Sequence, residues 1–157
     1  RGGVGPEKLQ TIAILEEEGA DLSRVIFGHS DLSATDMPLL LELLEHGVYV
    51  EFDLLGRVGV PVSLTPGKDT TGLRLPLTAP VAGAIPELIE AGYADRILLS
   101  QDVCTKVQLK AYGGTGYSYI LETFLPHLRT RGVSEEQIHM MMVDNPKCAL
   151  TLKEPVA

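Results

Sequence analysis

The stretch that decides the fold is Val25-Ile26-Phe27-Gly28-His29-Ser30-Asp31, a short apolar run that breaks into a side chain able to bind a metal ion. A second stretch, Arg96-Ile97-Leu98-Leu99-Ser100-Gln101-Asp102, ends in the same way. Each follows a helix-like segment that is closed by a glycine. Buried parallel strands have this pattern, and in βα folds the functional groups follow the ends of such strands. His29 and Asp102 are therefore the first candidates for function.

Helices and strands alternate along the rest of the chain. Apolar periodicity predicts helices over 6–18, 36–46, 80–91, 117–131 and 135–143, strands over 25–27, 48–52 and 97–99, and long loops over 54–78 and 103–117. A capping box of Ser134 and Gln137 marks the start of the last helix. Short helix-to-strand links with long strand-to-helix loops are typical of α/β folds that carry function at the carboxyl ends of their strands.

Three strands are too few to close a barrel, which usually needs about 250 residues. We therefore expect residues 1–157 to form a single partial domain, the last part of a longer chain that begins inside a strand-to-helix loop. The chain starts at Arg1 rather than methionine, which leaves open whether a targeting signal lies upstream.

The composition limits the class of protein. The chain has 157 residues, of which 45% are apolar and 22% charged, as expected for a soluble globular unit. The net charge of −8 argues against nucleic acid or an anionic membrane surface as a partner. No apolar run approaches the roughly 20 residues that span a bilayer. Cys104 and Cys148 are too few for a disulfide framework, and free thiols favour the cytoplasm.

His29 and Asp102 each have two interpretations from position alone. His29 lies one residue beyond its strand, where a neutral imidazole could bind zinc or could bond to a neighbouring loop. Asp102 could bind a metal ion, accept a proton or cap the following segment. The other three histidines fall in predicted helices, where a structural role is the commoner one.

Other polar residues near the strand ends complete the set of candidates. Asp53 ends the middle strand and could orient a metal ligand. Arg57, in the loop that follows, could hold an anionic or carbonyl-bearing substrate group, or could be a solvated loop arginine. Cys104 could line the same pocket. Asp31 and Asp36 are predicted to be turn and N-cap residues before the helix over 36–46.

Three motifs stand in order along the chain, Gly19-Ala-Asp-Leu-Ser-Arg-Val-Ile-Phe-Gly-His29-Ser-Asp31, Leu99-Ser-Gln-Asp102-Val-Cys104-Thr-Lys106 and Lys110-Ala-Tyr112-Gly-Gly-Thr-Gly116-Tyr117-Ser-Tyr119-Ile-Leu121. They resemble the sixth strand, the eighth strand, and the loop and helix after it in phosphotriesterase-like metal-dependent hydrolases of the amidohydrolase superfamily. The third motif is similar to the branch that contains phosphotriesterase-related proteins and lactonases. The resemblance covers essentially the whole chain.

The resemblance implies a (β/α)8 TIM barrel, of which this chain would be the C-terminal part, about strands 6–8 and their helices. Such barrels hold two divalent metal ions, usually zinc, that are bridged by a hydroxide. His29 matches the sixth-strand ligand and Asp102 the eighth-strand ligand, and Asp102 would also take the proton from the attacking hydroxide. The remaining ligands would lie upstream of Arg1, and Arg57 and Cys104 would lie on the substrate side.

The resemblance also implies a small-molecule lactone, carboxylic ester or phosphotriester as substrate, and a possible homodimer. Gln101, Leu54 and Leu32 depart from residues that accompany phosphotriester cleavage in the family, which favours a lactone or carboxylic ester. Two alternatives remain: a catalytically silent barrel segment that acts in assembly or binding, and a small α/β binding module without metal. The isolated chain is expected to be a poor enzyme, because it carries only two of the ligands.

Overall fold

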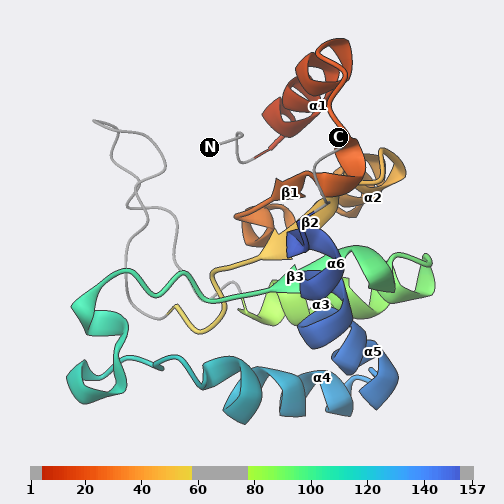
Figure 1. The fold of residues 1–157 in the computed structure, drawn as a ribbon. Coiled ribbons are helices and arrows are strands. Elements are labelled where there is room, and N and C mark those ends of the chain that lie inside the picture. Colours follow the sequence, from red (N-terminus) through yellow and green to blue (C-terminus); the bar gives the residue numbers. More distant parts are fainter. Residues whose placement is uncertain (1–4, 58–77, 153–157) are drawn as a thin grey trace.

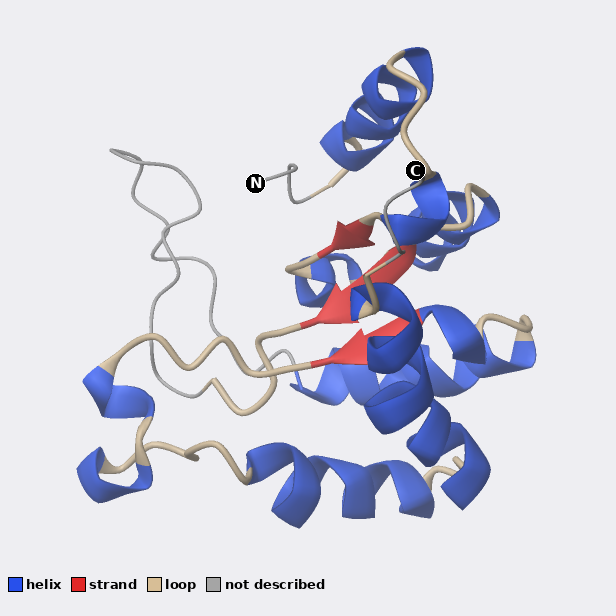
Figure 2. Ribbon diagram, in the orientation of Figure 1, coloured by secondary structure: helices blue, strands red, loops and turns tan. Residues whose placement is uncertain are grey.

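A three-stranded parallel sheet lies at the centre of the chain. The computed structural model describes residues 5–57 and 78–152, and the sheet has the order β1 (Ile26–Phe27), β2 (Tyr49–Phe52), β3 (Ile97–Leu99). Phe27 lies opposite Val50, and Phe52 lies opposite Leu99. All three strands point the same way, towards the left in Figure 2, so their carboxyl ends meet at one edge of the sheet. The predicted strands are confirmed.

One helix precedes each strand, as predicted (Figure 1). The helices are α1 (Glu7–Glu17), α2 (Met37–Glu45) and α3 (Thr78–Glu90), and the chain closes with α4 (Leu125–Thr130), α5 (Glu135–His139) and α6 (Asn145–Leu150). The predicted loop over 54–78 lies largely outside the described residues. The α/β order is therefore that of consecutive βα units.

Helix α2 illustrates how local sequence sets an element. The Asp36 carboxylate accepts a hydrogen bond from the backbone N–H of Leu39, so Asp36 is the predicted N-cap. Leu40 and Leu44, one turn apart, are buried against the sheet. Gly47 follows the helix with a φ of 80°, a conformation that glycine adopts without strain. The helix ends where the sequence predicts.

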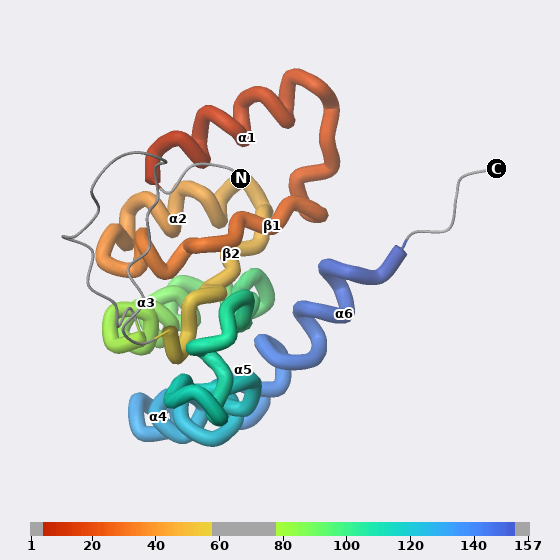
Figure 3. The backbone as a smooth tube through the Cα atoms, turned by 90° about the vertical axis from the view of Figure 1, so that its left-hand side faces the viewer, coloured from red at the N-terminus to blue at the C-terminus, as the bar shows by residue number. Residues whose placement is uncertain are grey.

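The two faces of the sheet are covered differently. Val50 and Phe52 of β2 pack with α2, α3 and the closing helices in the main core, and Phe27 of β1 packs with α1 and α2. The other face carries Tyr49 and Leu98, which contact Ala149 of α6. Figure 3, which looks along the strands, places α2 and α3 on one side of them and α6 on the other.

The closing helices differ from the prediction at two prolines. A π-helical turn, Ile120–Phe124, leads into α4, and a second, Met140–Asp144, joins α5 to α6. In each turn a backbone N–H bonds five residues back, just before Pro126 and Pro146. A proline cannot donate the next helical hydrogen bond, and the wider turn accommodates this. The last helical run therefore continues to Leu150 instead of ending at Val143.

Helix α6 is fastened to the amino ends of the strands. The Asn145 amide Nδ2 donates to the carbonyl oxygens of Ala94 and Ile97, both at 2.8 Å. The Arg24 guanidinium, just before β1, donates to the carbonyl oxygens of Cys148 and Thr151. The last helix is thus tied to the edge of the sheet opposite the carboxyl ends.

Asn145→Ala is expected to lower the free energy of unfolding by about 1–3 kcal/mol, because it leaves buried carbonyl oxygens without their donor. The measurement is urea unfolding followed by circular dichroism. Cys148→Ala, at an exposed position of the same helix, is the control. Equal stability of the two variants would contradict the fastening role of Asn145.

The loop after β3 packs on the end of β2. It contains two short 3₁₀ helices, Lys106–Gln108 and Lys110–Tyr112, that the sequence pattern does not predict. The Thr115 hydroxyl donates to the carbonyl oxygen of Gly56 at 2.8 Å. A Cβ at Gly56 would come within 2.6 Å of the Tyr119 ring, so glycine is required for this contact.

Among residues 5–57 and 78–152, no helix combines the length and apolarity that a bilayer crossing demands.

Candidate active site at the carboxyl ends of the strands

His29 and Asp102 share an unusual backbone conformation. His29 has a φ of 53° and Asp102 a φ of 43°, and in the described part of the chain they are the two non-glycine residues with positive φ. They lie just beyond the ends of β1 and β3, at the same edge of the sheet. Left-handed backbone at non-glycine residues is costly and gathers at functional sites. The geometry thus singles out the two residues that the sequence pattern marks.

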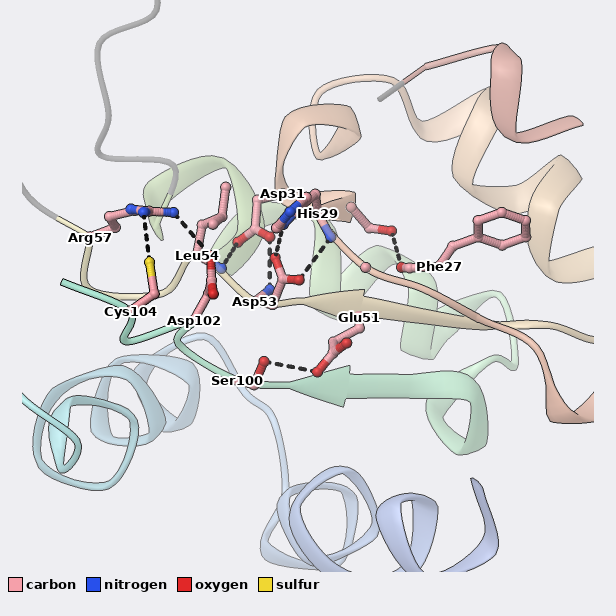
Figure 4. Close-up of polar contacts among 12 residues, drawn as sticks. Phe27, His29, Asp31, Glu51, Asp53, Leu54, Arg57, Ser100, Asp102 and Cys104 are labelled. Atoms are coloured by element: carbon pink, nitrogen blue, oxygen red, sulfur yellow. Dashed lines mark hydrogen bonds and ion pairs between the residues drawn. The ribbon is translucent and has the colours of Figure 1, made fainter. Parts of the chain in front are cut away.

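Asp53, beyond the end of β2, holds His29 by two hydrogen bonds (Figure 4). The backbone N–H of His29 donates to Asp53 Oδ2 at 3.0 Å, and its imidazole Nδ1 lies 2.8 Å from Asp53 Oδ1. Because a carboxylate accepts, Nδ1 carries the proton and Nε2 is left as the nitrogen with a lone pair. Histidine ligands of metal ions are commonly oriented in this way. These two hydrogen bonds are the direct contact that the predicted orienting role of Asp53 requires.

Asp31 lies in a 3₁₀ turn, Ser30–Ser33, before α2, as predicted, but its side chain has a further role. Its carboxylate reaches the segment just beyond β2 and accepts hydrogen bonds from the backbone N–H groups of Asp53, at 2.8 Å, and Leu54, at 3.2 Å. It is almost fully buried. The sequence does not predict this contact, because both donors lie more than twenty residues away from Asp31 along the chain. Asp31 fixes the backbone from which the Asp53 side chain reaches His29.

Arg57 and Cys104 lie together beside Asp102. Arg57 Nη1 donates to Asp102 Oδ2 at 3.2 Å, and its Nη2 lies 3.5 Å from the Cys104 sulfur. The Arg57 side chain is only 10% exposed, so it is not a solvated loop arginine. The Asp102 carbonyl oxygen accepts a hydrogen bond from Gln108 Nε2 at 3.0 Å. Three of the predicted site residues thus form one contact group, while Cys104 itself is exposed.

A further carboxylate, Glu51, faces the same side of the sheet. Glu51 on β2 accepts a hydrogen bond from the Ser100 hydroxyl, beyond β3, at 2.8 Å. Figure 4 shows the pair beside Asp53 and Asp102, towards the interior of the sheet. Sequence reasoning missed Glu51, although a charged residue inside an apolar strand run is a usable signal. Glu51 adds a negative charge next to the sheet edge that carries the candidate site residues.

Burial shifts the ionisation of several groups around this edge. Burial raises the pKa of Asp31, and the neighbouring charge of Asp53 adds to the increase, against the backbone N–H groups that lower it. Burial also raises the pKa of Glu51, opposed by the hydrogen bond from Ser100. Perturbed carboxylates gathered at one sheet edge are typical of a functional site.

The donor set fits part of a metal site. The imidazole Nε2 of His29 and the carboxylate of Asp102 are both donors that zinc accepts. Within residues 5–57 and 78–152, no group of three or more histidine, cysteine, aspartate or glutamate side chains is placed to hold an ion. Two donors cannot complete a four-coordinate centre. These two residues therefore suit ions whose other ligands come from elsewhere.

Gly28→Ala is expected to disturb this site sterically. A Cβ at Gly28 would lie 2.9 Å from Asp53 Oδ2, the oxygen that binds the His29 backbone. The carboxylate must move, so we expect metal affinity or activity to fall about 10–100-fold, as for other residues that orient ligands. Gly83→Ala is the control, since nothing lies within 4 Å of its Cβ position. Chelator competition measures the effect, and equal affinity of both variants would refute the steric argument.

Lys8 is a second residue that sequence reasoning missed. It is fully buried in α1, one turn before Ile12 on the side of the helix that faces β1. A lysine in register with the apolar positions of a helix is the signal that could have found it.

The remaining histidines, at 46, 127 and 139, are exposed on helix surfaces, in keeping with structural roles.

The chain matches known proteins over nearly its whole length. Residues 2–150 match the model of the phosphotriesterase family. The chain is 38% identical over 144 residues to the N-acetyltaurine hydrolase of Pongo abelii, covering 92% of this chain and 40% of that protein. It therefore spans about two fifths of the length of the curated relatives it matches.

Solved structures share the fold as well. A resiniferatoxin-binding protein from Rhodobacter sphaeroides superposes with a TM-score of 0.79 at 35% identity, over 90% of this chain and 37% of that chain. A mutant PTE-like lactonase from Deinococcus radiodurans superposes with a TM-score of 0.73 at 31% identity, over 94% of this chain and 45% of that chain. The family expected from the three sequence motifs is thus confirmed, and the chain belongs to the phosphotriesterase family.

Proposed function

We propose that residues 1–157 supply, as one partial domain, the last part of a (β/α)8 barrel whose active site is a binuclear metal-dependent hydrolase centre. In this proposal β1, β2 and β3 are the sixth to eighth barrel strands, and His29 and Asp102 bind divalent ions, with zinc as the first candidate. The observation that carries the proposal is the shared left-handed backbone of these two residues at one sheet edge. The other ligands are expected on earlier strands of the barrel.

Each residue has a defined task in this proposal. Asp53 keeps the proton on His29 Nδ1 and so presents Nε2 as a ligand. Asp102 serves as a ligand and accepts the proton released as the nucleophile attacks. Arg57 holds Asp102 in place before substrate binds and offers its guanidinium to an anionic or carbonyl oxygen. A bound pair of divalent ions would supply Lewis acidity and a nucleophile at neutral pH.

The bond that we propose for cleavage is an acyl bond. Among the relatives, the N-acetyltaurine hydrolase, at 38% identity, is named for an N-acyl amide that ends in an anion, and the lactonase, at 31%, for a cyclic ester. Arg57, a largely buried cation beside Asp102, suits the anion of the first substrate class. We therefore place a small anionic N-acyl amide first and a lactone or carboxylic ester second. Leu54, at 2% exposure, is packed in the core and offers no proton relay for a phosphotriester.

The test is a metal analysis and a substrate panel on the full coding sequence that contains residues 1–157. The panel contains N-acetyltaurine, a γ-lactone, a linear carboxylic ester and an aryl phosphotriester. We expect hydrolysis of the amide or the lactone that a chelator abolishes and divalent zinc restores. Purified protein that binds no divalent ion and cleaves none of these compounds would refute the proposal and favour a silent barrel segment.

A further inference from the structure

Lys8 is a buried cation that the proposed mechanism does not use. The residue is 0% exposed, in the first turns of α1 on the outer side of the sheet. Removing an ammonium group from water is costly unless hydrogen bonds and opposite charges compensate. Its neighbours on the helix include Ile12 and Leu9, which pack with Phe27 in an apolar cluster. An apolar residue would meet the packing requirement of this position, so the charge needs another explanation.

The contacts of Lys8 converge on the turn that presents His29. Its Nζ donates to the carbonyl oxygen of Gly28 at 3.1 Å and to the Ser30 hydroxyl at 2.9 Å. The Ser30 hydroxyl in turn donates to the carbonyl oxygen of Phe27 at 2.8 Å. The ammonium also lies 5.9 Å from the centre of the Phe27 ring. Lys8 therefore binds the residues on both sides of His29 without touching His29 itself.

Two acidic residues near the turn, Asp53 and Asp31, carry charge of the opposite sign to that of Lys8. Burial lowers the pKa of Lys8 to about 8, while the charges of Asp53 and Asp31 oppose that decrease. The ammonium form thus prevails at neutral pH, so Lys8 presents a positive charge to the turn that Asp53 binds by two hydrogen bonds to His29.

The left-handed conformation of His29 needs support of this kind. A non-glycine residue in this region persists when its surroundings hold it there. Asp53 fixes the backbone N–H and the ring of His29, and Lys8 fixes the carbonyl oxygen before it and the side chain after it. The turn is therefore held from both β2 and α1.

We propose that Lys8 is a positioning residue for His29: from α1 it clamps the turn Gly28–Ser30 and so sets where the imidazole is presented. The proposal rests on the proposed function for its catalytic consequence, because it takes His29 to be a metal ligand. Its structural content, the dependence of the His29–Asp53 contact on Lys8, stands independently of any metal ion.

The test compares Lys8→Met, which keeps the length of the side chain without charge or donors, with Lys8→Arg, which keeps the charge. Lys147→Met, at an exposed position of α6, is the matched control. Ser30→Ala, which removes one acceptor and leaves Lys8 in place, replaces Lys8→Met if that variant does not fold. Circular dichroism and urea unfolding establish that each variant is folded.

The main measurement is zinc affinity by chelator competition on the full coding sequence, together with kcat and KM. We expect Lys8→Met to weaken zinc binding about 10–100-fold and to lower kcat more than it raises KM, with partial recovery in Lys8→Arg. A merely structural role would lower stability and leave zinc affinity and kcat of the folded protein unchanged. Wild-type zinc affinity in folded Lys8→Met and Ser30→Ala would overturn the proposal.

A second measurement separates this proposal from the proposed function. In metal-free protein, the Nδ1 proton of His29 that is bound to Asp53 is observed by NMR as a downfield, exchange-protected signal. We expect this signal in wild type and Lys147→Met and its loss in Lys8→Met. If wild-type protein binds no zinc, the proposed function fails, and this signal still decides the role of Lys8: its persistence in Lys8→Met overturns that role.

Discussion

Asp102→Asn is expected to lower kcat of the metal-loaded enzyme by roughly 10²–10⁴-fold, the range that a positioned proton acceptor contributes. Asparagine keeps the shape of the side chain and tolerates the left-handed backbone of Asp102, whose φ is 43°, so backbone strain does not confuse the result. What it removes is the negative charge that, in the proposed function, binds an ion and takes the proton. The measurement is steady-state hydrolysis of the substrate that wild-type protein prefers, at saturating zinc.

The matched control for this prediction is Asp36→Asn. Asp36 caps α2, and asparagine caps helices as well as aspartate does, so this variant should retain full activity. Wild-type turnover by Asp102→Asn would show that the carboxylate at the end of β3 neither binds an ion nor moves a proton.

His29→Asn is expected to reduce zinc affinity beyond the roughly 100-fold loss that follows removal of an outer partner of a ligand. The imidazole is the group that Asp53 orients with Nε2 free, and an asparagine side chain does not supply that nitrogen. Asparagine again accepts the left-handed conformation. The bound zinc is quantified by elemental analysis after dialysis, and the affinity by chelator competition.

His46→Asn provides the control, because His46 is an exposed residue at the carboxyl end of α2 that pairs with Glu16. It should bind zinc as wild type does. A His29→Asn variant with the wild-type zinc content would place the ligand elsewhere and remove the main support for the proposed metal centre.

Local sequence predicts the architecture because local interactions decide it. The cap at Asp36 and the capping box at Ser134 are contained within one helical turn each, and the structure has both. The strands at 26–27, 49–52 and 97–99 follow from apolar runs between helices. The end predicted at Val143 was wrong, since a proline such as Pro146 ordinarily ends a helix and the widened turn that passes it depends on the surrounding packing.

The site could be predicted less completely, because its contacts join residues far apart in sequence. His29 and Asp102 stand out by their place after strands, but nothing local indicates that Asp31 bonds to the backbone of Asp53 and Leu54. The same holds for Arg57, which is 45 residues from the carboxylate it binds. Lys8 looks like a surface lysine until the fold buries it behind β1. Such contacts exist only once the sheet has assembled.

The placement of the α6 anchors bears on how this fold can acquire new substrates. Arg24 and Asn145 fasten the last helix at the amino ends of the strands, while Arg57 and Cys104 lie at the carboxyl ends. If Arg57 and Cys104 contact the substrate as proposed, stability and recognition are encoded by separate sets of residues on opposite rims. Natural drift or directed evolution can vary the recognition rim while the anchoring rim keeps the protein folded. A scaffold divided in this way tolerates change at the rim where new chemistry arises.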